Sequence, residues 1–129
     1  MDNIRIEATE RTPEVDFSFE DNIFSLRGEA YPEDVNEFFG PLIDQLEEHF
    51  ASLDSAEVSF NFELIYFNSS TAKILMMLFE LLDSTAGEKN NQVTVNWLYD
   101  ADDDNMEELG EEYGEDLENA KFNLVPQDN

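Results

Sequence analysis

The chain has 129 residues, a length typical of one domain, and 41% of them are hydrophobic and 12% aromatic, enough to build one packed core. Its 32 acidic and 6 basic residues give a formal net charge of −26, which disfavours binding to nucleic acid or to anionic membranes. The absence of cysteine excludes disulfides, thiolate metal sites and cysteine nucleophiles. No N-terminal signal segment and no long apolar run is found, so we expect a cytoplasmic protein.

The first quarter of the chain has the pattern of strands. Residues Asn3–Ala8 predict a short first strand. Apolar and polar residues alternate in Val15–Phe19, and a second strand-like segment follows at Ile23–Ala30. The intervening Glu20–Asn22 has turn-forming residues, so the two segments predict an antiparallel hairpin.

The middle of the chain alternates between helical and strand patterns. Residues Tyr31–Leu53 carry apolar side chains at helical spacing. Residues Val58–Phe67 begin by alternating and then become apolar at consecutive positions, which is typical of a central strand covered by helices on both sides. The segment that begins at Ser69 has helical spacing again and leads into a predicted loop at Ser84–Asn91.

The C-terminal part completes the alternation. Residues Val93–Tyr99 predict a strand, and Asn105–Ala120 predict an amphipathic helix. Gly110 and Gly114 lie on the apolar stripe of that helix and indicate a close approach to its neighbour. A final edge strand is predicted at Lys121–Val125. The sequence therefore predicts one α/β domain over residues 1–129, with an N-terminal β-hairpin, about three main helices and a mixed, mainly parallel sheet.

The densest acidic tract raises the possibility of a calcium site. Asp100, Asp102, Asp104 and Glu111 fall at positions 1, 3, 5 and 12 of the EF-hand loop pattern. Asn105 stands where that loop needs glycine, and a strand precedes it where an EF-hand has a helix. A solvated acidic helix explains the tract better, and calcium binding remains the weaker alternative.

Enzymatic chemistry has no support in the sequence. His49 is the only histidine, and no serine or aspartate is placed by sequence to complete a catalytic triad with it. A partly exposed structural histidine is the preferred interpretation. The five glycines are scattered and form no phosphate-binding loop. We therefore predict a protein that is not an enzyme and has no cofactor.

Three consecutive hydroxyl residues, Ser69, Ser70 and Thr71, stand between the central strand and the following helix. One hydroxyl is sufficient to cap a helix N-terminus, so capping alone does not account for three. A helix N-terminus also stabilises a phosphate group through its free N–H groups and its dipole. Lys73 lies one turn from Ser69 and is placed to meet an added phosphate. The cluster thus favours capping, phosphorylation or both.

Four stretches of the sequence resemble the successive motifs of one bacterial family. They are "TP" at Thr12-Pro13, "GEAYPEDVNEFFGPLID" (Gly28–Asp44), "LIYFNSSTAKILM" (Leu64–Met76) and "WLYDADDDNMEELGEEY" (Trp97–Tyr113). They resemble the SiaC-type regulatory phosphoproteins, which are STAS-like. The strand–helix junction with its hydroxyl cluster is also similar to that of STAS domains, the anti-sigma-factor antagonists. The resemblance implies a STAS-like fold and spans nearly the whole chain in order.

The resemblance implies a non-enzymatic switch protein. In that family the hydroxyl directly after the asparagine is phosphorylated by a Ser/Thr kinase and dephosphorylated by a PP2C-type phosphatase. The unphosphorylated form binds and activates a diguanylate cyclase, which promotes cyclic di-GMP synthesis and biofilm formation. On this chain the acceptor is Ser69, with Ser70 as the alternative because STAS proteins often use the second hydroxyl. The switch surface then comprises Tyr66, Phe67, Asn68, Ser70, Thr71 and Lys73.

The identity of the output partner stays open, since the resemblance also allows another output enzyme or a sigma-factor circuit. A rival from a different class is an acidic interaction protein without a phosphoswitch, such as a nucleic-acid mimic or inhibitor. That rival requires charge spread at phosphate spacing, whereas much of the acid here is concentrated in the last predicted helix and its approach. The phosphoswitch is therefore the preferred hypothesis.

Overall fold

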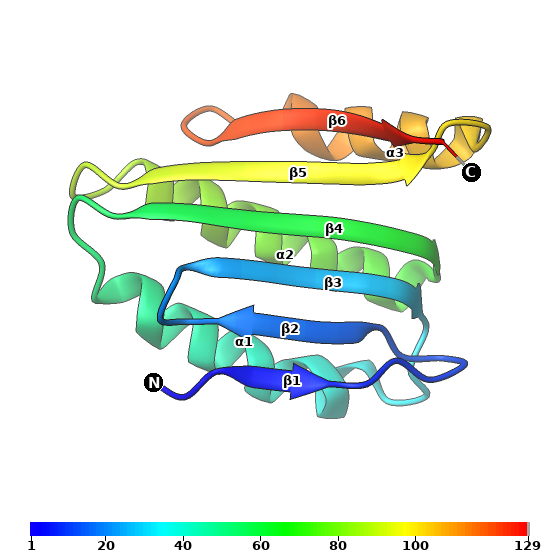
Figure 1. The fold of residues 1–129 in the computed structure, drawn as a ribbon, viewed down its shortest axis with the longest axis horizontal. Coiled ribbons are helices and arrows are strands. Elements are labelled where there is room, and N and C mark those ends of the chain that lie inside the picture. The colour runs from blue at the N-terminus through cyan, green and yellow to red at the C-terminus, as the bar shows by residue number, and fades with distance from the viewer. Residues whose placement is uncertain (129) are drawn as a thin grey trace.

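A six-stranded sheet runs through the computed structural model, which describes residues 1–128 (Figure 1). Its strands are β1 (Ile4–Ile6), β2 (Glu14–Ser18), β3 (Ile23–Ala30), β4 (Glu57–Phe67), β5 (Gln92–Asp100) and β6 (Lys121–Gln127). The helices are α1 (Val35–Ala51), α2 (Ser69–Ala86) and α3 (Asp104–Glu115). The predicted α/β class, the N-terminal hairpin of β2 and β3, and the three helices are confirmed.

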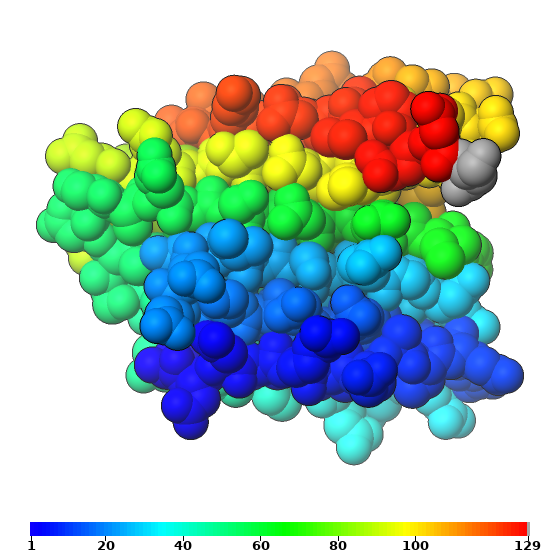
Figure 2. Space-filling model, in the orientation of Figure 1, coloured from blue at the N-terminus to red at the C-terminus, as the bar shows by residue number. Residues whose placement is uncertain are grey.

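The strands lie in the sheet in the same order as in the chain, from β1 to β6. The first three pair antiparallel, and β3, β4, β5 and β6 pair parallel. Each parallel pair is joined by one helix, and such connections are right-handed. Because every connection steps in the same direction across the sheet, all three helices lie on one face (Figure 1). Figure 2 views the opposite face, where the strands lie side by side without a covering helix.

The prediction of helices on both sides of the sheet is therefore wrong. Along most of β4 burial alternates, as expected of a strand with one covered face, and the inward side chains are Val58, Phe60, Phe62 and Leu64. The consecutive apolar residues at the end of β4 have another cause. The register with β3 passes from Gly28–Leu64 to Glu29–Tyr66, which makes Ile65 an extra residue in a β-bulge. Ile65 and Tyr66 are consequently 66% and 51% exposed.

The core fills the single layer between the sheet and the helices. The largest fully buried side chains are aromatic, namely Phe17, Phe24, Phe39, Phe60, Phe62 and Trp97. Rings from neighbouring strands contact one another, with the centroids of Phe24 and Phe60 5.9 Å apart and those of Phe62 and Trp97 5.9 Å apart. Each buried Phe stabilises the fold by about 1.5–3 kcal/mol, so this layer holds the sheet and α2 in fixed positions.

The last helix lies very close to the sheet, as its glycines predicted. A Cβ atom added to Gly110 would overlap the indole of Trp97, and one added to Gly114 would overlap the ring of Phe122. The helix ends at Glu115, however, five residues before the predicted end at Ala120. The reason is Asp83 of α2, whose carboxylate accepts hydrogen bonds from the backbone N–H groups of residues 118–120.

The loop between α2 and β5 is shorter than predicted, because α2 continues to Ala86 and takes in the first three residues of that segment. Thr85 explains the extension, since it is buried and its Oγ1 donates a hydrogen bond to the carbonyl of Leu81 one turn earlier. Within residues 1–128, none of the helices has the length and apolar character needed to cross a membrane.

Candidate functional site at the junction of β4 and α2

The hydroxyl cluster lies at the sheet edge where the four parallel strands end. Strand β4 ends at Phe67, and α2 begins at Ser69. The residue between them, Asn68, is the N-cap, and its Oδ1 accepts a hydrogen bond from the N–H of Thr71 at 3.0 Å. The capping interpretation of the three hydroxyls is therefore wrong, because asparagine performs that function and all three hydroxyl residues lie within the first turn.

The three hydroxyls differ sharply in accessibility. Ser69 and Ser70 are exposed, whereas Thr71 is fully buried and its Oγ1 has no hydrogen-bond partner. A modifying enzyme can reach the two serines but not the threonine. The backbone N–H groups of the two serines belong to the first turn, where a helix provides no acceptor. The exposed hydroxyls and the free N–H groups thus coincide at Ser69 and Ser70.

The aromatic residues of the predicted switch surface have different environments. Tyr66 is exposed, and its ring meets that of Tyr31 edge-on with centroids 5.5 Å apart. Phe67 is partly buried, and its ring centroid lies 6.3 Å from those of both Trp97 and Tyr113. Phe67 therefore packs toward the interior. Ile65, which the sequence did not single out, takes its place beside Tyr66 on the surface.

The start of α2 has little negative charge despite the composition of the chain. Its first turn contains no acidic residue, and its cap is a neutral amide. Lys73 is exposed, one turn from Ser69, and forms no ion pair within residues 1–128. Within α2 and its cap, no carboxylate therefore compensates the positive end of the helix dipole, and this is the electrostatic setting that stabilises a phosphate.

The residues of the EF-hand-like pattern do not converge. Helix α3 already begins at Asp104, so Glu111 lies about two turns, or about 10 Å, farther along it. The Oδ1 atom of Asp100 accepts a hydrogen bond from the N–H of Asp102 at 2.9 Å. In the described part of the chain, no three His, Asp or Glu side chains are grouped so that they could hold a metal ion.

His49 lies far along α1 and contacts the turn between β2 and β3 rather than a catalytic group. Its Nε2 is 2.6 Å from Oδ1 of Asn22, and its ring meets Phe19 edge-on with centroids 5.0 Å apart. Desolvation by burial, followed by the positive charge of the N-terminus, lowers the pKa of His49. This environment favours a neutral histidine that supports packing.

Comparison with known proteins gives concordant results. The sequence model of the SiaC family regulatory phosphoproteins matches residues 6–127. An uncharacterised protein of Pseudomonas aeruginosa (strain UCBPP-PA14) is 31% identical over 116 residues, which cover 90% of each chain.

Two solved structures share the fold over nearly the full length. The crystal structure of apo-SiaC from Pseudomonas aeruginosa has a TM-score of 0.84 at 30% identity, covering 97% of this chain and 99% of that one. The structure of the diguanylate cyclase SiaD in complex with its activator SiaC, from the same organism, contains a chain with a TM-score of 0.87 at 29% identity. The match covers 96% of this chain and 99% of that one.

Proposed function

Because this chain belongs to the SiaC family of regulatory phosphoproteins, we propose that it binds and activates a diguanylate cyclase under the control of phosphorylation. A regulatory phosphoprotein acts on other proteins, and the chain is accordingly not an enzyme. The likeness to the SiaC chain bound to a diguanylate cyclase supports a cyclase as the output partner. The output is then cyclic di-GMP synthesis and, through it, biofilm formation.

In this proposal Ser69 is the phosphate acceptor, with Ser70 as the alternative. A Ser/Thr kinase adds the phosphate, a PP2C-type phosphatase removes it, and the unphosphorylated form binds the cyclase. The observation that carries the proposal is the first turn of α2. It combines two exposed serines, a neutral cap and Lys73, without any acidic residue. A phosphate bound there receives N–H groups, the helix dipole and one cation.

The phosphate acts locally in this mechanism. It adds about 1.5–2 negative charges, a small change beside the formal −26 of the chain. Long-range steering of a partner therefore changes little. A partner packed against Ile65, Tyr66 and the first turn of α2 would instead have to bury a dianion. Leaving a buried charge without a partner costs about 3–5 kcal/mol, which corresponds to a loss of affinity of more than 100-fold.

Lys73 supports the phosphorylated state in the free protein. Its ammonium has no acidic partner within residues 1–128, so it can pair with a phosphate on Ser69 without breaking an existing contact. This ion pair partly neutralises the phosphate within the free protein and stabilises the phosphorylated, unbound state. We expect Lys73→Ala to speed dephosphorylation.

The decisive experiment combines intact mass with binding. The chain is incubated with ATP and a Ser/Thr kinase encoded beside it, and one added phosphate is expected. Ser69→Ala abolishes that addition, whereas Ser70→Ala does not; the reverse result assigns the site to Ser70. Binding to a diguanylate cyclase from the same genome is then measured by calorimetry. Ser69→Ala binds as the unmodified chain does, and Ser69→Asp binds weakly.

Ser84→Asp provides the matched control, because it adds the same charge to an exposed serine near the other end of α2. Its affinity for the cyclase should equal that of the unmodified chain. A nucleic-acid mimic would respond to none of these substitutions. If the loss of binding on phosphorylation disappears at high salt, long-range repulsion is its cause and the local mechanism is wrong.

A further inference from the structure

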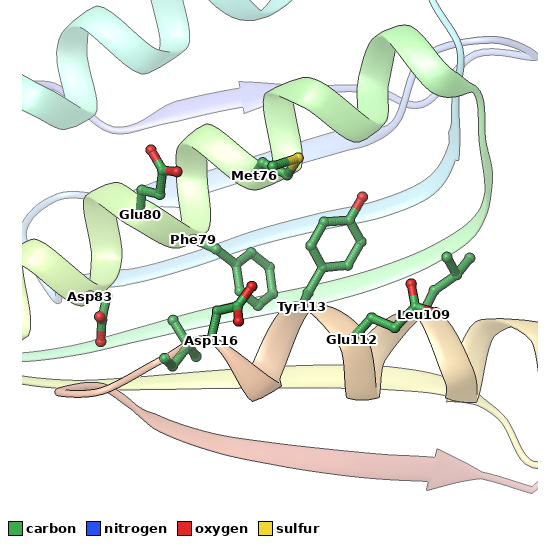
Figure 3. Close-up of a pocket in the computed structure, with 9 residues that line it drawn as sticks. Met76, Phe79, Glu80, Asp83, Leu109, Glu112, Tyr113 and Asp116 are labelled. Atoms are coloured by element: carbon green, nitrogen blue, oxygen red, sulfur yellow. The ribbon is translucent and has the colours of Figure 1, made fainter.

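A groove lies between α2 and α3 on the helical side of the molecule, with a volume of about 330 Å³. Figure 3 shows Phe79 from α2 and Tyr113 from α3 pointing into it, with Met76 of α2 beside them. Leu109 and Leu117 complete the apolar lining. Met76 is 54% exposed, and its neighbour Met77, outside the lining, is 50% exposed. Exposed methionines are typical of surfaces that adapt to a bound helix.

The walls of this α2–α3 groove are held in place by the fold. Helix α3 is seated close to the sheet through Gly110, and Tyr113 fixes its distance from α2. The hydroxyl of Tyr113 donates a hydrogen bond to the carbonyl of Ala72 at 3.3 Å. Burial, followed by the charge of Glu112, raises the pKa of Tyr113, so the hydroxyl keeps the proton that it donates. The groove is therefore preformed.

Carboxylates border the apolar lining. Glu80 stands on α2, and Glu112 and Asp116 stand one turn apart on α3 (Figure 3). None of the three takes part in an ion pair within residues 1–128, and no basic residue lines the groove. The carboxylate of Asp83, at one end, is already occupied by backbone N–H groups. Three free negative charges thus surround an apolar floor.

We infer that the α2–α3 groove binds a basic amphipathic α-helix of the output partner. The apolar stripe of that helix packs on Phe79 and Tyr113, and its Lys or Arg side chains pair with the carboxylates of the rim. Charge complementarity selects this occupant, and a third helix fits between two others with its side chains in the groove. The inference rests on the proposed function, since it names the segment of the output partner that the chain recognises.

The groove also connects to the phosphorylation site. Ser69, Lys73, Met76 and Glu80 follow one another on the exposed face of α2 at helical spacing. Ser69 and Met76 are seven residues apart, or about 10 Å along the helix axis. A partner helix that continues past the end of the groove therefore meets the first turn of α2. One partner can then contact both the groove and the serine.

The groove can be tested with a designed peptide. A fluorescein-labelled helix of about 14 residues, or about 21 Å, carries leucines on one face and lysines on the other. A scrambled peptide of the same composition and charge serves as its control. We expect fluorescence anisotropy to show binding of the amphipathic peptide at least tenfold tighter than binding of the scrambled one. Equal affinities would mean non-specific attraction to an acidic protein and would overturn the inference.

Charge reversal locates the site. The double variant Glu112→Lys/Asp116→Lys reverses two rim charges, and Asp44→Lys/Glu48→Lys makes the same change at the same spacing on the exposed face of α1. The rim variant should weaken peptide binding at least tenfold and the α1 variant less than twofold. Equal losses in both variants would overturn the inference. Circular dichroism establishes that both variants are folded, and Tyr113→Asp, which charges the floor, provides an independent second disruption.

The same variants, tested against the diguanylate cyclase, separate the two proposals. If the unmodified chain binds the cyclase and the rim variant binds equally well, the groove inference fails while the proposed function stands. If the peptide binds in a rim-dependent manner and the cyclase does not bind, the groove stands as a site for a basic helix and the proposed function fails. If the rim variant loses cyclase binding and the α1 variant keeps it, the groove inference and the proposed function are both supported.

Discussion

The starts of α2 and α3 are built alike but differ in charge. Both helices begin at the carboxyl end of a parallel strand, and in both an Asx side chain accepts the N–H three residues on, at 3.0 Å for Asn68 and 3.1 Å for Asp103. Helix α3 has a carboxylate cap and two further acids in its first turn, Asp104 and Glu107. Helix α2 has a neutral cap and none. The first α-helix also follows the acidic pattern, with Asp34 and Glu37.

The net charge of the chain hides this difference between its helix N-termini. In a chain with 32 acidic residues, carboxylates neutralise the positive ends of α1 and α3 permanently. In the proposed mechanism, the positive end of α2 receives a charge that can be added and removed. The absence of acid from the first turn of α2 is therefore as informative as the presence of the serines.

The largest effect on stability is expected at the other end of α2. Asp83 lies in the last turn, where a carboxylate is unfavourable for the helix dipole, yet it accepts backbone N–H groups of residues 118–120. We expect Asp83→Ala to lower the free energy of unfolding by about 1.5–3 kcal/mol, measured by urea denaturation. A loss equal to that of the exposed Glu80→Ala would show that these hydrogen bonds do not matter.

The stabilisation by Asp83 should also depend on pH. Burial acts to raise its pKa, but the hydrogen bonds from Ala120, Asn119 and Glu118 outweigh that effect, and the folded pKa lies below the ordinary value of 3.8. The contribution is therefore complete above the unfolded pKa and is lost as the pH falls through the folded pKa. Below about pH 4, the stabilities of the parent chain and of Asp83→Ala should converge.

A smaller effect is expected where α3 approaches the sheet. Gly110→Ala places a methyl group against Trp97, and overpacking of this kind costs about 1–3 kcal/mol, partly offset by about 1 kcal/mol of helix propensity. Because the added Cβ would overlap the rigid indole, we expect the upper part of that cost, about 2–3 kcal/mol, and hence a net loss of about 1–2 kcal/mol in thermal or urea unfolding, with altered Trp97 fluorescence. Glu111→Ala, on the exposed side of the same helix, is the control and should change stability little. An unchanged Gly110→Ala would contradict the close packing.

Removing the cap of α2 is expected to cost about 1 kcal/mol. In Asn68→Ala the N–H of Thr71 loses its acceptor, whereas in Ser69→Ala it does not. Urea denaturation should therefore separate the two variants, with Ser69→Ala close to the parent chain. Equal destabilisation of both variants would mean that the hydroxyl cluster contributes to capping as much as Asn68 does.

The smallest effect comes from exchanging the charge of the two caps. Asn68→Asp should stabilise the chain by about 0.3–1 kcal/mol at low salt, because a carboxylate then meets the free positive end of α2. Asp103→Asn removes one of several carboxylates and should change stability less. Both effects should disappear at about 1 M salt. A destabilising Asn68→Asp would mean that nearby acids already outweigh the dipole.

Much of this architecture can be predicted from the sequence, because the apolar residues of each element follow a clear helical or strand periodicity. The hairpin of β2 and β3, the strand over Val93–Tyr99 and the stripe of α3 follow from it. The one-sided sheet does not follow, since the face that a helix covers depends on the order of strands in space. The apolar pair Ile65 and Tyr66 has the same local composition in a bulge as in a strand buried on both faces, so the sequence pattern does not distinguish the two.

The site was predictable to a similar extent. The burial of Thr71 could have been found, since it precedes Ile74 and Leu75 by three and four residues on the inward stripe of α2. The choice of Asn68 rather than a serine as the cap could not have been predicted, because asparagine and serine are both good N-cap residues and Asn68 and Ser69 are adjacent in the sequence. The groove between α2 and α3 depends on how closely α3 approaches the sheet, which the glycines indicate but do not measure.

The sequential strand order has a consequence for how the chain folds. Every strand pairs only with its immediate neighbours in the sequence, so each β–α unit can be added to the free edge of the sheet already formed. No strand has to be inserted between two that are already paired, and each loop closure spans a single helix. Because closure entropy and contact order rise with sequence separation, this arrangement favours stepwise growth of the sheet and fast folding for a mainly parallel architecture.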